Sequence, residues 1–238
     1  MDSKFYSSLE KSISKSRLST YGDSTSKEID RIKNYILNAK ISENFYFLLQ
    51  NLEVSLRNAI YESFKLHYGD KKDFFFLYET DSRQRYKGRK EKHSRECWKM
   101  ICSAKYNIIN SSSTISDGKI IAELNFGFWT KLLASTDSKY TNMWRKIFGD
   151  VFPHYTITQS VDHDKILIGQ EIDKIRDLRN RMFHYEPIFN KAPKQYHDKI
   201  LESTKWINDS LYEMNMMFDE FEDIYNSKDK IKDKMGKN

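Results

Sequence analysis

The apolar residues of this chain recur three and four positions apart, which is the spacing of one face of an α-helix. The longest such stripe consists of Phe45, Leu48, Leu49, Leu52, Leu56 and Ile60. Ser42 precedes this stripe as a candidate N-cap, and Gly69 follows it as a candidate stop. We therefore predict one long helix over residues 43–68.

The same spacing predicts helices along most of the remaining chain. We expect helices over 4–17, from about 26 to 39, over 120–133 with a bend at Gly127, over 138–149, over 161–184 and over 195–226. A further helix is expected to run through Trp98, Ile101 and Tyr106 and to end at about residue 110. The whole sequence contains only eight glycines and three prolines, so long uninterrupted helices are favoured and an all-β fold is disfavoured. The predicted fold class is all-α.

The predicted helices follow one another without a composition change that would mark a linker. We therefore expect a single all-helical domain over residues 1–226. Residues 227–238 are rich in lysine and aspartate and lack apolar periodicity, so we expect a disordered tail there.

Charge and cysteine content narrow the functional classes only slightly. The net charge of +6, from 40 basic and 34 acidic residues, is compatible with a nucleic-acid partner and equally with an ordinary solvated surface. Cys97 and Cys102 form neither a zinc pattern nor a disulfide framework, so no metal or other cofactor is expected. No signal sequence and no membrane-spanning run is visible, and we expect a cytoplasmic protein.

The densest positive charge lies in residues 83–95. Its candidate phosphate-contacting side chains are Arg83, Arg85, Lys87, Arg89, Lys90 and Arg95. An exposed basic loop leading into a helix, with no ligand, explains the same pattern equally well.

The most unusual stretch is the end of the predicted helix 161–184, where three arginines, an asparagine and a histidine fall within nine residues. Arg176, Asn180 and His184 share one helical line, whereas Arg179 lies about 140° away from His184 on an ideal helix. Arg181 adds a further positive charge and is a candidate RNA-binding residue. Pro187 predicts that the helix ends just after the histidine.

These residue types suit the cleavage of RNA, which carries its own nucleophile in the ribose 2′-hydroxyl. A histidine can take or give the proton near neutral pH, and arginines can stabilise the phosphorane. No metal is needed for this chemistry. On spacing alone, a helix end with ordinary basic residues is the competing interpretation.

The amino-acid sequence around these residues is a more specific signal than their spacing. The segment Leu178-Arg-Asn-Arg-Met-Phe-His-Tyr-Glu-Pro-Ile188 resembles the signature of the Abi-like HEPN proteins, the abortive-infection family of bacterial phage defence. Leu52-Glu-Val-Ser-Leu-Arg-Asn-Ala-Ile60 resembles the N-terminal Glu-x3-Arg helix of that family, and Phe126-Gly-Phe-Trp-Thr-Lys-Leu132 resembles its middle segment. The three blocks come in the family's order.

This resemblance implies an all-α, HEPN-type helical bundle, here with extra N-terminal and C-terminal helices. It also implies a metal-independent endoribonuclease that acts as a homodimer with a composite active site on an RNA substrate. A cognate small non-coding RNA is a further implied partner, as a regulator. Membranes are not among the expected partners.

By position, the resemblance assigns Arg179 and His184 as the catalytic pair and Asn180 as a residue that supports the site. Glu53 and Arg57 would be supporting residues near it. Arg176, which shares the helical line of His184, is a further supporting residue and a candidate phosphate contact. Tyr185 departs from relatives that often carry a second histidine at this place. Two alternatives remain open: a HEPN module that binds RNA without cleaving it, and a scaffold whose polar helix face is a dimer interface.

Overall fold

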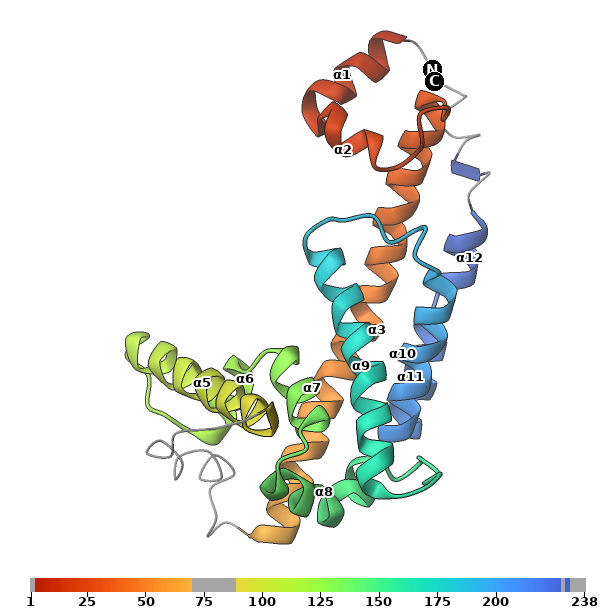
Figure 1. Cartoon of the computed structure of the whole chain (residues 1–238). Coiled ribbons are helices and arrows are strands. Elements are labelled where there is room, and N and C mark those ends of the chain that lie inside the picture. The colour runs from red at the N-terminus through yellow and green to blue at the C-terminus, as the bar shows by residue number, and fades with distance from the viewer. Residues whose placement is uncertain (1–2, 70–88, 228–229, 232–238) are drawn as a thin grey trace. The chain divides into compact units, whose positions relative to one another are not determined.

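The computed structural model describes residues 3–69, 89–227 and 230–231, and every regular element among them is a helix (Figure 1). The helices are α1 Ser3–Ile13, α2 Lys15–Ser19, α3 Glu28–Tyr68, α5 Arg89–Asn110, α6 Asp117–Glu123, α7 Phe126–Ala134, α8 Ser138–Val151, α9 Val161–Phe183, α10 Pro193–Ile207, α11 Asp209–Phe218 and α12 Phe221–Asn226. The all-α prediction is confirmed. Of the predicted disordered tail, the structure describes only Ser227, Lys230 and Ile231.

The chain divides into two compact units, each assembled from segments far apart in sequence. Unit 1 comprises Met1–Gln50, Asp177–Leu201 and Glu213–Asn238, and unit 2 comprises Asn51–Arg176 and Glu202–Tyr212. Helices α3 and α9 contribute residues to both units. The single domain predicted over residues 1–226 stays a prediction.

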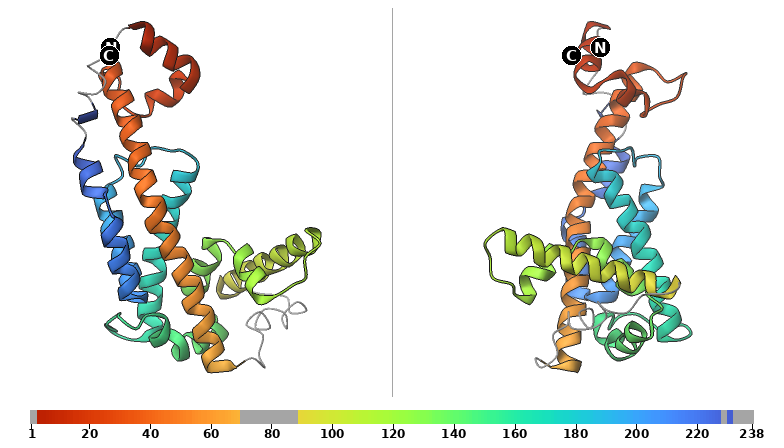
Figure 2. Two further views of the ribbon diagram at one scale, coloured as in Figure 1. Left: turned by 180° about the vertical axis from the view of Figure 1, so that it is seen from behind. Right: turned by 60° about the vertical axis from the view of Figure 1, so that its left-hand side comes forward.

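The core of unit 1 joins the first half of α3 to the C-terminal part of the chain (Figure 2). The ring of Phe45 on α3 stacks with the rings of His197 on α10 and Phe221 on α12, at centroid distances of 6.4 and 5.4 Å. Phe45 and Phe221 are fully buried. Aromatic packing of this kind stabilises unit 1 through the large area that each ring removes from water.

The core of unit 2 contains the aromatic segment that resembles the middle block of the HEPN family. Phe126, Phe128 and Trp129 are buried. Trp144 on α8 is also buried, and its indole N–H donates to the carbonyl of Leu132 over 3.0 Å. These aromatic rings therefore fill the core and do not form a base-stacking platform.

Two predictions of helix boundaries are wrong. Residues 26–39 and 43–68 do not form separate helices, because α3 runs without a break through Ser42. The bend expected at Gly127 occurs earlier, where Leu124 adopts an extended conformation and Asn125 caps α7. An Asn side chain that accepts the Phe128 N–H satisfies a helix start, so Gly127 is left inside the first turn.

The last predicted helix, over 195–226, is interrupted twice. Asn208 separates α10 from α11, and its side-chain oxygen accepts the N–H of Leu211 over 2.8 Å as a new N-cap. Asp219 and Glu220 separate α11 from α12, and the Asp219 carboxylate accepts the N–H of Phe221 over 3.1 Å. Short polar side chains that bond to the backbone compete with helix continuation at both places.

None of the described helices is both long enough and apolar enough to cross a membrane.

Candidate functional site

The signature segment ends helix α9 through a pair of backbone hydrogen bonds typical of the Schellman motif. The Glu186 N–H donates to the Arg181 carbonyl, and the Tyr185 N–H donates to the Met182 carbonyl, each over 2.9 Å. The His184 N–H still donates to Asn180 over 3.0 Å in helical fashion. His184 is therefore the C-cap residue, and the helix ends where Pro187 predicted.

Tyr185 occupies the position of the Schellman motif that is usually glycine. Its φ of 56° lies in the left-handed region, where a side chain costs about 1 kcal/mol. The Arg17 guanidinium donates to the Tyr185 carbonyl, and the Tyr21 hydroxyl does so over 3.5 Å. Residues from the N-terminal end of the chain thus hold the strained peptide that follows His184.

The segment after Tyr185 is fixed by a buried amide on α3. The side-chain oxygen of Asn38 accepts the N–H groups of Ile188 and Phe189 over 2.7 and 3.1 Å. Asn38 is only 5% exposed, so these bonds are shielded from water. Loss of the amide would leave two backbone donors without a partner in a largely dry environment.

Arg179 is half-buried and is oriented by its neighbours on α9. Its Nη1 donates to the Asn180 side-chain oxygen over 3.4 Å, and its Cζ lies 4.4 Å from the centroid of the Phe183 ring. A cation over an aromatic face is stabilised by the ring quadrupole. These two contacts orient the Arg179 guanidinium.

His184 is exposed, and within the described ranges its imidazole has no recorded hydrogen bond or ion pair. Asn180 contacts both catalytic candidates, because its side chain accepts from Arg179 and its backbone carbonyl accepts from His184. The structure therefore brings Arg179, Asn180 and His184 together at one helix end, with the imidazole open to a ligand.

Arg176 belongs to unit 2, whereas the other three signature residues belong to unit 1. Its Nε lies 2.8 Å from the Asp173 carboxylate, and its guanidinium packs close to Gly127. The ion pair with Asp173 reduces the positive charge that Arg176 would offer to a phosphate. The structure supports an anchoring role for Arg176 at α7 better than a phosphate contact.

Glu53 and Arg57, the other supporting candidates, lie one turn apart on α3 in unit 2. Both are half-buried. The Nε of Arg57 is buried without a hydrogen-bond partner among the residues described. A buried guanidinium N–H without an acceptor destabilises the fold. A polar group that accepts a hydrogen bond would therefore be accommodated next to the Arg57 Nε.

The basic segment is only partly visible. Arg83, Arg85 and Lys87 lie outside the described residues, and Arg89 and Lys90 begin α5 with side chains outside the description. Arg95 is exposed. Arg181 is also exposed, and its guanidinium pairs with Glu186 over 3.2 Å, where Schellman motifs often have an apolar contact.

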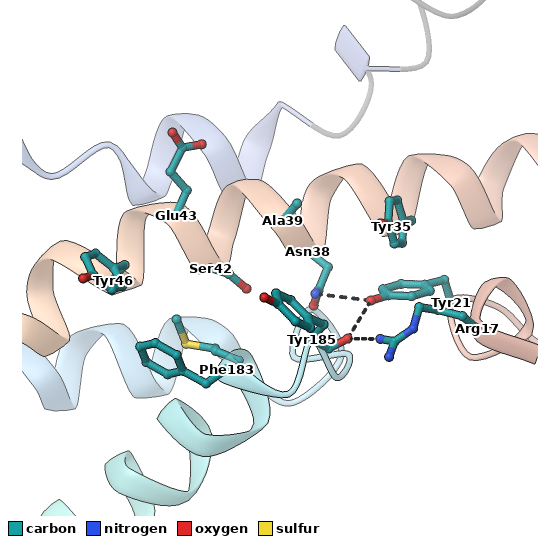
Figure 3. A pocket seen from close by; sticks show the side chains of 11 residues that line it. Arg17, Tyr21, Tyr35, Asn38, Ala39, Ser42, Glu43, Tyr46, Phe183 and Tyr185 are labelled. Carbon is teal, nitrogen blue, oxygen red and sulfur yellow. Dashed lines mark hydrogen bonds between the residues drawn. The ribbon is translucent and has the colours of Figure 1, made fainter. Parts of the chain in front are cut away.

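A cavity lies beside the signature segment, and no pattern in the sequence predicted it. Figure 3 shows this cavity, of about 640 Å³, with the side chains of α3 and of the α9 terminus around it. Its lining comprises Arg17, Tyr21, Tyr35, Asn38, Ala39, Ser42, Glu43, Tyr46, Met182, Phe183 and Tyr185. The lining residues come from three separate segments of unit 1, so no local motif could reveal them. We call this space the tyrosine cavity.

The described side chains offer no cluster of three or more His, Cys, Asp or Glu residues placed to share a metal ion. The chemistry available at the end of α9 is that of an imidazole, a guanidinium and an amide. Such a set can exchange a proton and stabilise a phosphate. Neither a protein-family model, nor a curated protein, nor a solved structure matches this chain significantly.

Proposed function

We propose that this protein is a metal-independent endoribonuclease of the Abi-like HEPN class, acting in bacterial phage defence. One observation carries the proposal: Arg179, Asn180 and His184 gather at one helix end, with an exposed imidazole and an oriented guanidinium. The resemblance of the signature segment supports the same assignment. A HEPN-type bundle with additional terminal helices, in a cytoplasmic protein, is part of this proposal.

The reaction begins when His184 takes the proton of a ribose 2′-hydroxyl. The 2′-oxygen attacks the adjacent phosphorus, and the 5′-oxygen of the next nucleotide leaves with a proton. The products are a 2′,3′-cyclic phosphate and a 5′-hydroxyl. Arg179 stabilises the negative charge of the phosphorane, and Asn180 holds the guanidinium in place through its 3.4 Å hydrogen bond.

A second copy of the chain supplies the second proton-transfer group. One polypeptide contributes a single His184, whereas acid and base act on opposite oxygens of the phosphorus. In a symmetric dimer, two α9 ends facing each other place one imidazole on each side of the scissile phosphate. Exposure of His184 and of the neighbouring Tyr185, at 76%, is compatible with such an arrangement.

The test is a cleavage assay on end-labelled RNA in EDTA. Wild-type protein should produce fragments that end in a 2′,3′-cyclic phosphate, and His184→Ala and Arg179→Ala should not. Lys191→Ala removes an exposed cation from the same unit and serves as the matched control. Cleavage that survives His184→Ala would overturn the mechanism. Light scattering on the same samples tests for the dimer.

A module that binds RNA without cleaving it is the second candidate. It is favoured by one observation: the exposed His184 imidazole has no partner that orients it in the part of the chain described. Such a module could hold a cognate small non-coding RNA. Wild-type protein that binds RNA and leaves it intact, even with its natural RNA partner present, would favour this reading.

A further inference from the structure

We propose that the tyrosine cavity binds one unpaired nucleobase of the RNA, next to the phosphate held at the end of α9. This inference rests on the proposed function and names a subsite for it. The cavity volume of about 640 Å³ lies within the range of small-molecule sites, roughly 300–1,000 Å³, and leaves room for a base with its ribose.

The rings around the cavity are suited to stacking. Tyr46 and Phe183 meet at one end with centroids 6.1 Å apart and planes tilted by 56°, while Tyr21 and Tyr35 meet edge to face at 5.2 Å. In Figure 3 the Tyr185 ring lies between these two pairs. Every nucleobase has a π-face, so aromatic walls are the usual means of holding a base without reading its sequence.

Three of these large aromatic rings are exposed to solvent. Tyr46 is 53% exposed, Phe183 is 48% exposed and Tyr185 is 76% exposed. They gather around one hollow and are not scattered over the surface, which is typical of a binding site. A base inserted among them would remove both its own faces and these rings from water.

The polar groups of the cavity explain why stacking should dominate. The Asn38 oxygen is occupied by two backbone N–H groups, and the Tyr21 hydroxyl interacts with Asn38 and the Tyr185 carbonyl. The Ser42 hydroxyl and the Glu43 carboxylate also line the cavity and are the polar side chains left to read a base edge. We therefore expect weak base selectivity, with purines preferred because they stack over a larger area.

The cavity is joined to the candidate catalytic residues by Phe183. The Phe183 ring lines the cavity and also carries the Arg179 guanidinium at 4.4 Å. His184 lies between two cavity residues, Phe183 and Tyr185, in the chain. A base in the cavity would thus hold its own phosphate within reach of Arg179, and Arg17 adds a second positive charge in the lining.

The test measures binding separately from cleavage. The probe is a fluorescent single-stranded RNA of about ten nucleotides, 2′-O-methylated so that it cannot be cut, and its anisotropy is followed in EDTA. Tyr46→Leu removes a stacking ring, and Tyr46→Phe keeps it. Ala39→Leu fills the cavity from the same helix. Phe218→Leu removes a 67%-exposed ring of unit 1 that does not line the cavity.

We expect Tyr46→Leu and Ala39→Leu to weaken binding by at least about fivefold, and Tyr46→Phe and Phe218→Leu to stay within about twofold of wild type. An oligoadenylate should bind more tightly than an oligouridylate, and this preference should vanish in Tyr46→Leu. Wild-type affinity in both Tyr46→Leu and Ala39→Leu would overturn the subsite.

The two proposals fail in different ways. Cleavage by wild type together with unchanged binding in the cavity variants removes the subsite and leaves the nuclease. Loss of binding in the cavity variants, with no cleavage by wild type, keeps the subsite and removes the nuclease. No binding of RNA by wild-type protein overturns both.

Discussion

The guanidinium of Arg179 lies over the ring of Phe183, with its Cζ 4.4 Å from the ring centroid. A flexible cation is thereby held in one place before any phosphate arrives, which lowers the entropic cost of binding. The same ring forms part of the wall of the tyrosine cavity. Phe183 therefore contacts the residue proposed to stabilise charge and the space proposed to hold a base.

Replacement of Phe183 by leucine should lower kcat/KM for RNA cleavage while changing the free energy of unfolding little. Leucine keeps an apolar surface but removes the π-face under Arg179, so the guanidinium loses its orientation. We expect a fall in kcat/KM of about tenfold, with the larger part in kcat if Arg179 acts on the phosphorane. Steady-state cleavage assays and urea denaturation measure the two effects. An unchanged kcat/KM would show that the ring does not position Arg179.

Arg179→Lys distinguishes positive charge from guanidinium geometry. Lysine keeps the charge but cannot form the same planar contacts with Phe183 and a phosphate. We expect Arg179→Lys to cleave RNA at least about tenfold more slowly than wild type, with RNA affinity much less affected. Retention of the wild-type rate would mean that only the charge of Arg179 matters. Lys191→Arg, at an exposed position, is the matched control.

Replacement of Tyr185 should change the stability of the protein through its left-handed backbone conformation. Glycine at this position relieves the left-handed backbone, so Tyr185→Gly should be as stable as wild type or up to about 1 kcal/mol more stable. Tyr185→Val places a β-branched side chain at the same φ and should lose about 1 kcal/mol or more. Urea denaturation followed by circular dichroism compares the three proteins. A Tyr185→Gly protein much less stable than wild type would contradict the assignment of strain.

Asn38→Ala should destabilise the protein by about 2 kcal/mol, because it leaves the N–H groups of Ile188 and Phe189 without their buried acceptor. The same change should raise hydrogen exchange at residues 185–189 selectively. Asn58→Ala, at an exposed position of the same helix, is the control and should be nearly neutral. Equal exchange at residues 185–189 in both variants would remove Asn38 as the anchor of this segment.

Asp164 should make unit 2 sensitive to acid. Burial opposes ionisation of its carboxyl, but hydrogen bonds from Thr158 and Gln159 outweigh that effect and hold the pKa at about 2. A carboxyl whose pKa is lower in the folded state stabilises the fold above its ordinary pKa of 3.8. This stabilisation is lost as the pH falls from about 4 towards 2.

Asp164→Asn should therefore lower the free energy of unfolding at neutral pH and flatten its decline between about pH 4 and pH 2. Urea denaturation across this range compares the variant with wild type. Asp162→Asn is a useful comparison, because Asp162 is only half-buried and pairs with Arg145 at the protein surface. A parallel acid decline in Asp164→Asn and wild type would exclude Asp164 as its source.

Helical periodicity predicted the fold class and most helices because long apolar stripes leave few alternatives for the backbone. It failed at boundaries that local polar chemistry decides. Ser42 is a residue type that often caps helices, but it lies inside α3. Asn125 and Asn208, in contrast, do cap helices. A capping residue acts only where the tertiary structure breaks the helix, and a single sequence does not contain that information.

The signature segment was predictable because its chemistry is concentrated within a few residues. Pro187 located the helix end, but the left-handed conformation of Tyr185 could not be anticipated, since tyrosine is not typical of that position. The anchors Arg17 and Asn38 were missed because they lie far from the signature in sequence. Only the folded chain brings them to the Tyr185 carbonyl and the Ile188 N–H.

The discontinuous make-up of unit 1 has a consequence for synthesis on the ribosome. The segment Met1–Gln50 is synthesised long before its partners Asp177–Leu201 and Glu213–Asn238. Asn38 cannot accept the N–H of Ile188 until the polymerisation of 150 further residues is complete. The end of α9 therefore acquires its anchored conformation only after a long stretch of chain downstream of Asn38 has been made, and a fragment that stops before Ile188 would leave the Asn38 amide without these two backbone donors.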